Sequence, residues 1–205
     1  MSVRILPSGD HALLAELDRL DEVLALYRAL DAERPAGVVD LVPAARTIGV
    51  VVDPGVLPLS VAQAWVERTR PVVATPRDEH AVEILVHYDG EDLAAVAGLL
   101  GIGVREVVDL HTSSSWRVAF GGFAPGFGYL VTDHDRLRVP RRATPRTAVP
   151  AGSVGLAGEF SGVYPRSSPG GWQLIGTTDA VLWDAAADPP ALLRPGALVR
   201  FREAT

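Results

Sequence analysis

Hydrophobic and polar positions alternate with two different periods in the first 70 residues. Apolar residues recur every three or four positions over residues 20–32 and 59–70, a spacing that predicts two helices, each with one buried face. Four short apolar stretches predict strands over residues 3–7, 12–17, 38–42 and 47–53. The order strand, strand, helix therefore occurs two times in succession. This order is typical of an α+β unit with its helices on one face of a small antiparallel sheet.

The pattern changes after residue 80. A strand is predicted over residues 81–88, and helices are predicted over residues 89–100 and 105–111. Short β-like runs between Gly and Pro then predict strands over residues 116–120, 154–157, 172–177, 180–183 and 197–201. We therefore expect a small α+β domain over residues 1–72, a linker over residues 73–79, and a mainly-β domain, a closed barrel or a sandwich, over residues 80–205.

The amino-acid composition makes some classes of protein and of binding partner more plausible than others. With 48% hydrophobic residues, 20 Gly and 16 Pro among 205, the chain is typical of a globular, turn-rich protein. Its net charge of -6 argues against nucleic acids and anionic membranes as partners. The sequence shows no apolar run long enough to span a bilayer and no signal peptide, so a cytoplasmic protein is expected.

Missing residue types exclude several chemistries. The chain has no Cys, and all 19 basic residues are Arg. A Walker-type phosphate loop, a pyridoxal-phosphate enzyme and a Ser-Lys amidase all need Lys, and Arg does not deprotonate to replace it as a base. The five His residues show no zinc-type spacing, so no protein-bound metal site is expected.

Residues 120–130 carry four Gly, one Pro and four aromatics, which fix an irregular backbone. Such a loop is suited to walling a small-molecule pocket, with the N–H groups of its glycines facing an anion. The alternative is that the aromatics plug one end of the barrel. On the first interpretation the loop residues expected to line a substrate site are Gly122, Phe123, Pro125, Gly126, Phe127 and Tyr129.

Two further stretches carry candidate polar groups. Five Arg lie within residues 136–146, and Arg146, between Pro145 and Pro150, is the best candidate to bind an anion. The alternative for most of the five is a solvated or partner-facing basic strip. Gln173 lies in an otherwise apolar predicted strand, where its amide either ties loops together or faces a polar pocket.

Residues 122–130, 140–158 and 162–176 together resemble the family that comprises the B-type subunit of 5-oxoprolinase, also known as allophanate hydrolase subunit 1 or sporulation-kinase inhibitor. The family pattern is G-F-x-P-G-F-x-Y-L, then P-R-x-x-x-P-R-T-x-V-P-A-G-S-V-G-x-A-G, then G-x-Y-P-x-x-S-P-G-G-W-x-x-I-G, and this sequence follows it in order. It departs mainly at Ser114-Ser115-Trp116, where Tyr is more usual than Trp. The amidase label fits poorly, because a Ser-Lys amidase needs Lys.

The resemblance implies a cyclophilin-like β-barrel after the α+β domain, and tight association with a C-type subunit of similar fold, with an A-type subunit completing the assembly. It also implies ATP-dependent hydrolysis of 5-oxoproline to glutamate, with ATP and Mg as cofactors. Arg146, Gln173 and His111 are the expected catalytic residues, and Ser153 is expected to join the loop residues in binding substrate.

Two alternatives use the same barrel differently. One is a regulatory protein that docks on a sensor histidine kinase and inhibits it. The other, prolyl isomerase activity, rests on the barrel fold alone, and fold does not carry function.

Overall fold

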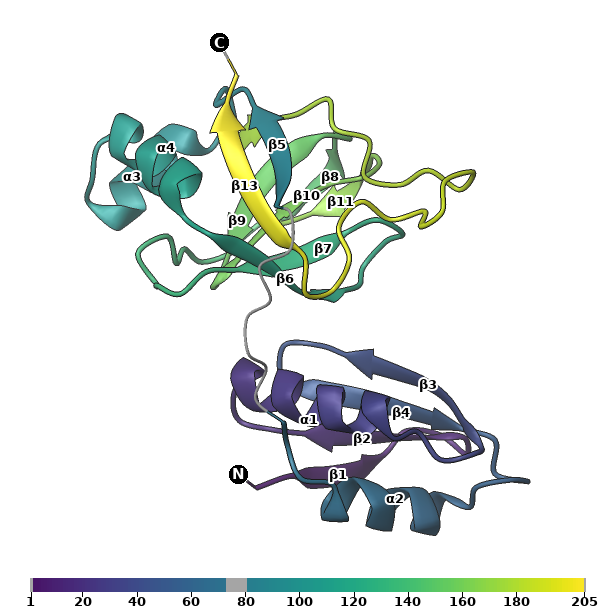
Figure 1. The fold of residues 1–205 in the computed structure, drawn as a ribbon. Coiled ribbons are helices and arrows are strands. Elements are labelled where there is room, and N and C mark those ends of the chain that lie inside the picture. Colours follow the sequence, from purple (N-terminus) through teal and green to yellow (C-terminus); the bar gives the residue numbers. More distant parts are fainter. Residues whose placement is uncertain (1, 73–80, 205) are drawn as a thin grey trace. The chain divides into compact units, whose positions relative to one another are not determined.

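The computed structural model describes residues 2–72 and 81–204, and its contacts divide the chain between residues 77 and 78 into two compact units. The predicted linker over residues 73–79 lies outside the described residues. Each unit is described by itself below, and both are drawn in Figure 1. Within the described residues, no helix is long and apolar enough to span a bilayer.

The first unit has the predicted order of elements: β1 (Arg4–Pro7), β2 (Ala12–Glu16), α1 (Leu20–Ala32), β3 (Val38–Pro43), β4 (Thr47–Val52) and α2 (Leu59–Arg68). The four strands form one antiparallel sheet in the order β1-β2-β4-β3. Along β4 the side chains of Ile48, Val50 and Val52 are buried, and those between them are less so. This period of two places one face of the sheet in the core.

Both helices pack on that buried face. Val23, Leu26 and Leu30 of α1 belong to the same core cluster as the buried side chains of β4. Ala62 and Val66 of α2 join it as well. The predicted packing of both helices on one face of a small antiparallel sheet is therefore confirmed.

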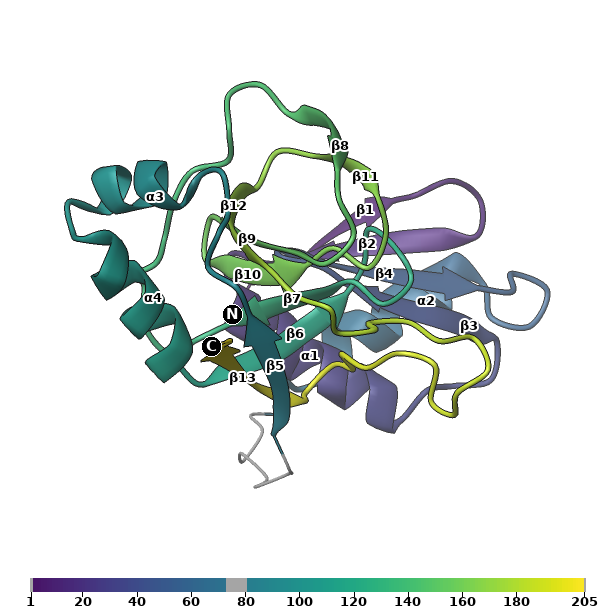
Figure 2. The same cartoon turned by 90° about the horizontal axis from the view of Figure 1, so that it is seen from above.

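The second unit contains the remaining elements. They are β5 (Val82–Val86), α3 (Leu93–Leu100), α4 (Val104–Ser113), β6 (Trp116–Gly121), β7 (Gly128–Val131), β8 (Arg146–Val149), β9 (Ser153–Ala157), β10 (Phe160–Val163), β11 (Ser168–Gly170), β12 (Gln173–Thr177) and β13 (Leu198–Glu203). Seven strands form one sheet in the order β12-β9-β10-β7-β6-β13-β5, whereas β8 and β11 pair as a separate ribbon (Figure 2).

A single bridge brings the two ends of this sheet together. His87, directly after β5, and Thr177, the last residue of β12, each donate a backbone N–H to the other's carbonyl oxygen at 2.8 Å. The sheet therefore curls into a nearly closed barrel, which confirms the predicted barrel domain. Its likeness to cyclophilins stays a prediction.

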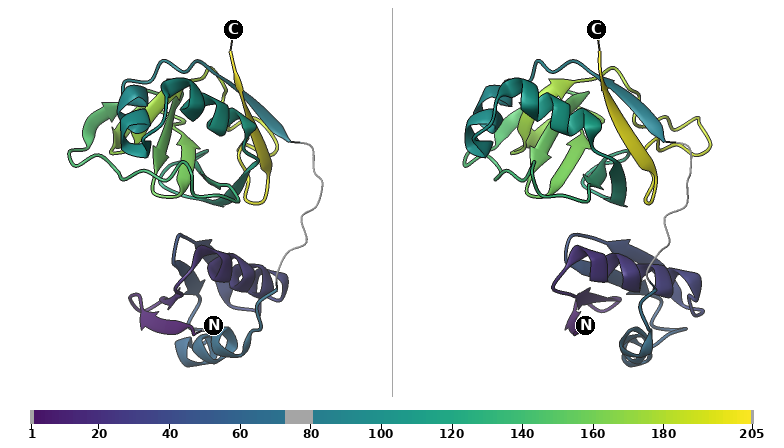
Figure 3. Two further views of the ribbon diagram at one scale, coloured as in Figure 1. Left: turned by 90° about the vertical axis from the view of Figure 1, so that its left-hand side faces the viewer. Right: turned by 60° about the vertical axis from the view of Figure 1, so that its left-hand side comes forward.

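Helices α3 and α4 lie against this barrel (Figure 3) and share its main core cluster through Val96, Val107 and Val108. The helix α3 ends at Gly101, whose φ of 69° is left-handed and therefore favours glycine. The predicted strand over residues 180–183 is wrong, because these residues form only one isolated bridge, between Trp183 and Ala191.

Candidate functional site

Phe127 lies at the centre of an aromatic cluster that is separate from the main core of the barrel. It comes from the Gly-rich loop, it is almost fully buried, and four rings meet it edge to face. Their centroids lie 5.1–5.5 Å from that of Phe127 and belong to Phe123, Tyr129, Tyr164 and Trp172. Edge-to-face contacts at this distance stabilise the packed rings beyond the effect of burying them, so the cluster forms a stable aromatic wall.

The loop backbone is held in an unusual conformation. Phe123 has a φ of 65°, the left-handed region that disfavours side chains, and 56% of its surface is exposed. Gly126 has a φ of 84°, and a Cβ built there would lie 2.8 Å from Cβ of Trp183. Strain held at an exposed aromatic residue is typical of a binding surface.

Asp92 organises the arginines beside this cluster. Its Oδ2 lies 2.9 Å from a terminal nitrogen of Arg146, and its Oδ1 accepts a hydrogen bond from Arg142 at 2.5 Å. The N–H of Leu174 donates to Oδ2 of Asp92 at 2.7 Å. Arg146 also reaches Glu91 at 2.9 Å. The nearly buried carboxylate of Asp92 therefore holds two guanidinium groups in fixed positions.

These contacts set the charge states. Burial alone would raise the pKa of Asp92, but the hydrogen bonds from Arg146 and Leu174 and the nearby Arg charges lower it below its usual value. The hydrogen bond to Asp92 is the main cause that raises the pKa of Arg146. Asp92 and Arg146 are therefore both ionised at neutral pH.

Residues 171–174 connect the aromatic and the charged groups. The carbonyl oxygen of Gly171 accepts the N–H of Arg142 at 2.8 Å, and the ring of Trp172 packs on Phe127. The Nε2 of Gln173 donates to the carbonyl oxygen of Pro140 at 3.1 Å. Leu174 then donates to Asp92. One short segment thus touches each part of the candidate site in turn.

The ribbon of β8 and β11 fixes the position of Arg146. Arg146 begins β8 and pairs with Gly170 at the end of β11, directly before residues 171–174. A Cβ at Gly170 would lie 2.3 Å from the hydroxyl oxygen of Tyr164, so only glycine fits there. The structure therefore connects Phe127, through Trp172, and Arg146, through Gly170, to one short segment, whereas the side chain of Gln173 contacts Pro140.

His111 lies elsewhere, inside the barrel core. It is fully buried, and its ring stacks on Phe201 at 4.3 Å between centroids. Its Nδ1 lies 2.7 Å from the hydroxyl of Tyr88 and its Nε2 lies 2.9 Å from that of Ser161. Burial lowers the pKa of His111 to about 3. The structure does not bring this residue to the surface that holds Arg146.

The other predicted residues fall into two groups. Gly122 and Pro125 are exposed on the loop, next to Phe123. Ser153 is buried at the start of β9, where its carbonyl oxygen accepts the N–H of Tyr164. Ser153 therefore supports the strand behind the aromatic cluster and does not face solvent.

Sequence reasoning missed Asp92, Tyr164 and the pairing role of Arg142. Asp92 stands in the run Asp89-Gly90-Glu91-Asp92, which by itself indicates only the start of a helix. The signal for Tyr164 and Trp172 is their place within the family motifs. Among the described residues, no group of three or more His, Asp or Glu side chains could hold a metal ion.

The sequence matches the family model for the carboxyltransferase domain, subdomains C and D, over residues 3–193. The chain belongs to this carboxyltransferase-domain family. It is 46% identical over 171 residues to the B subunit of the 5-oxoprolinase of Escherichia coli O157:H7, an alignment that covers 80% of this chain and 77% of that protein. The resemblance stated from the motifs is thereby confirmed.

Solved structures extend the likeness to the fold. The crystal structure of TTHA0988 is 36% identical, has a TM-score of 0.78 and covers all of this chain but 41% of that one. The Kluyveromyces lactis urea amidolyase has a TM-score of 0.76 over 99% of this chain, which spans 15% of that protein. At 20% identity this second likeness shows the fold alone.

Proposed function

We propose that this chain is the B-type component of an ATP-dependent 5-oxoprolinase, inactive alone, which forms a shared active site with a C-type subunit. The name of the Escherichia coli relative supports the substrate. One observation carries the proposal: residues 171–174 contact both the aromatic cluster at Phe127 and Asp92, the carboxylate that binds the guanidinium of Arg146.

The proposed reaction converts 5-oxoproline, ATP and water into glutamate, ADP and phosphate. The cyclic amide resists attack by water until its oxygen is phosphorylated, and that step develops negative charge. Arg146 and Arg142 are already oriented by Asp92 and would stabilise this charge without further reorganisation. The exposed ring of Phe123 would cover the apolar ring atoms of the substrate.

The described residues fit the phosphate of ATP better than they fit Mg. Both carboxylate oxygens of Asp92 are occupied by arginines and a backbone N–H, which leaves little for a cation. Guanidinium groups, in contrast, suit phosphate oxygens. We therefore propose that this chain offers charge to a phosphoryl group and that a partner subunit holds ATP and Mg.

Three observations bear on the remaining parts of the proposal. TTHA0988 is more than twice as long as this chain, so in that relative the same fold is joined to further polypeptide. This supports a C-type partner that completes the site, with an A-type subunit as the third component. Gln173 is proposed to position residue 140 and orient the lactam, while His111 does not enter the proposal because it is fully buried.

Reconstitution tests the proposal. Purified B-type, C-type and A-type subunits are mixed with ATP, Mg and 5-oxoproline, and glutamate and phosphate are measured. Glutamate should form only when this chain is present, with one phosphate released per glutamate. Equal glutamate formation by the A-type and C-type subunits without this chain would contradict the proposal.

A further inference from the structure

The barrel has an open seam beside the bridge between His87 and Thr177. On one side of the seam runs β5, and on the other side the chain continues past β12 as residues 178–180. A cavity of about 300 Å³ lies in the seam. Its lining residues are Glu83, Ile84, Leu85, His87, Thr178, Asp179, Ala180 and Ala204.

One backbone edge of β5 faces this seam. The carbonyl oxygen of Val86 accepts the N–H of Ala204 on the β13 side, whereas His87 pairs with Thr177 on the other side. Backbone groups of successive residues point to opposite sides of a strand, so those of Glu83 and Leu85 point the same way as those of His87. Within residues 2–72 and 81–204, β5 pairs with no strand except β13. An edge with free N–H and C=O groups is a template for another strand.

Exposed apolar side chains lie at the seam and directly after it. Leu85, which lines the cavity, is 61% exposed, and Val181, which follows the lining residue Ala180, is 71% exposed. Two residues after Val181 comes Trp183, which is 42% exposed and lies against Gly126 of the aromatic loop. Residues 181–183 therefore connect the seam to the loop that carries Phe123.

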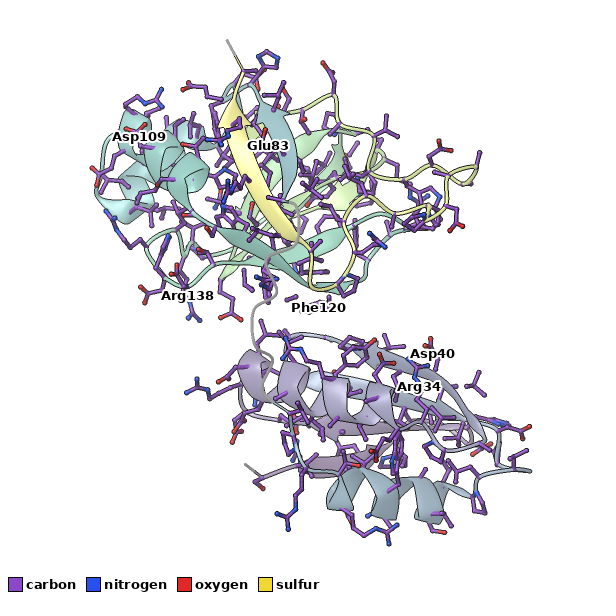
Figure 4. The ribbon with its side chains drawn as sticks, in the orientation of Figure 1. Arg34, Asp40, Glu83, Asp109, Phe120 and Arg138 are labelled. Carbon is purple, nitrogen blue, oxygen red and sulfur yellow. The ribbon has the colours of Figure 1, made fainter. Side chains whose placement is uncertain are left out.

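The seam also has a net negative charge. Glu83 projects from β5 (Figure 4) and pairs with Arg202 at 3.2 Å. Asp179 is exposed on the opposite side, and no ion pair is found for it among the described residues. An incoming strand with a basic side chain would match Asp179.

We propose that an extended segment of the C-type partner adds to the free edge of β5 as an extra strand, with apolar side chains on Leu85 and Val181 and a basic side chain near Asp179. The added strand would fill the seam and bring the partner to residues 181–183, which lead to the loop that carries Phe123. Strand addition of this kind takes affinity from backbone hydrogen bonds and specificity from alternate side chains. The inference rests on the proposed function, because that proposal supplies the partner.

Amide hydrogen exchange of the full chain, alone and with the purified C-type subunit, tests the strand addition. In the free chain the amides of Glu83 and Leu85 should exchange quickly, whereas those of Ile84 and Val86 should be protected by β13. In the complex the exchange of Glu83 and Leu85 should slow at least tenfold. Alternate protection along one strand distinguishes strand addition from general burial of the surface.

A matched pair of variants adds a second readout. Val181→Asp should weaken binding of the C-type subunit at least tenfold, while Leu99→Asp, at an exposed position of α3, should leave the Kd unchanged. A complex in which Glu83 and Leu85 keep exchanging quickly, or an unchanged Kd for Val181→Asp, would overturn strand addition alone. Absence of any complex with the wild-type chain would overturn both strand addition and the proposed assembly.

Discussion

Arg146 and Asp92 form a two-point ion pair: one terminal nitrogen of the guanidinium lies 2.9 Å from Oδ2 of Asp92, and the other lies 3.0 Å from Oδ1. The contact to Oδ1 is a charge-assisted hydrogen bond, which fixes the position of the guanidinium. Because Asp92 is nearly buried and also binds Arg142, its removal should affect the whole charged cluster.

Asp92→Asn is therefore expected to lower the free energy of unfolding by about 3 kcal/mol at pH 7, since it leaves two arginines without their buried partner. Urea denaturation measures this change. Asp109→Asn is the matched control, because Asp109 pairs with Arg105 on the exposed face of α4 (Figure 4) and should cost at most about 0.5 kcal/mol.

The same variant should change the acid dependence of stability. The folded-state pKa of Asp92 is lowered, so its contribution is present above the unfolded pKa and is lost as pH falls through the folded value. As the pH falls below the unfolded pKa of an Asp, the wild type should lose more stability than Asp92→Asn. Equal losses in the two proteins would show that the carboxylate does not have a lowered pKa.

Arg146→Ala should reduce glutamate formation by the reconstituted subunits about 100-fold or more, as expected for loss of a group that stabilises developing charge. Binding of the C-type subunit should persist. Arg138→Ala is the control, because Arg138 is exposed and lies at the rim of the barrel unit (Figure 4). Undiminished glutamate formation by Arg146→Ala would remove this residue from the site.

His111→Gln should make the free energy of unfolding less dependent on pH. The folded pKa of His111 is about 3, so the unfolded chain binds a proton at higher pH than the folded chain does. Stability of the wild type should therefore fall as pH drops from roughly 6.5 toward 3, by up to about 1.4 kcal/mol per pH unit. Urea titrations above and below the unfolded pKa of His measure the difference, with His11→Gln as an exposed control.

Phe123→Gly should change the free energy of unfolding of the isolated chain by less than about 1 kcal/mol, because glycine adopts a φ of 65° without strain while the loss of the ring removes edge-to-face contacts with Phe127 and Tyr164. The same change removes an exposed ring from the proposed substrate surface, so the KM for 5-oxoproline should rise. A lower stability together with an unchanged KM would assign Phe123 to packing of the loop.

Most of the first unit is predictable because its helices and strands are amphipathic with regular periods. The helix over residues 20–32 has the predicted bounds, and α2 ends two residues earlier than predicted. The alternation of apolar and polar residues indicates directly which face of each helix or strand packs against the hydrophobic core.

The barrel is predictable only in outline. The strands β7, β8, β10 and β11 have three or four residues each and lie among Gly and Pro, so they show no readable period. Their pairing depends on contacts distant in sequence, as between Gly170 and Arg146. Residues 180–183 look like a strand because Val181 and Trp183 alternate with Leu182, but only Leu182 is buried.

The candidate site shows the same limit. Sequence motifs propose Phe127, Arg146 and Gln173 as site residues, because glycine, proline and clustered arginine are visible in a single sequence. They do not identify Asp92, which lies 54 residues from Arg146 and meets it only in the folded barrel. They also place His111 in the site, although Trp116 and Phe201 enclose its ring.

His111, Trp116 and Phe201 pack against one another inside the barrel, with His111 stacked on Phe201 and Trp116 edge to face with Phe201. Trp116 and Phe201 belong to the main core of the barrel, and the aromatic cluster around Phe127 is separate from that core. In the proposed reaction, a phosphorylated amide formed beside the exposed ring of Phe123 would be open to bulk water on every uncovered side. Protection of this species from water therefore depends on the partner surface that covers the barrel. Substitutions that loosen the contact with that partner would let the phosphorylated species hydrolyse, so ATP would be consumed without glutamate formation before the overall rate fell.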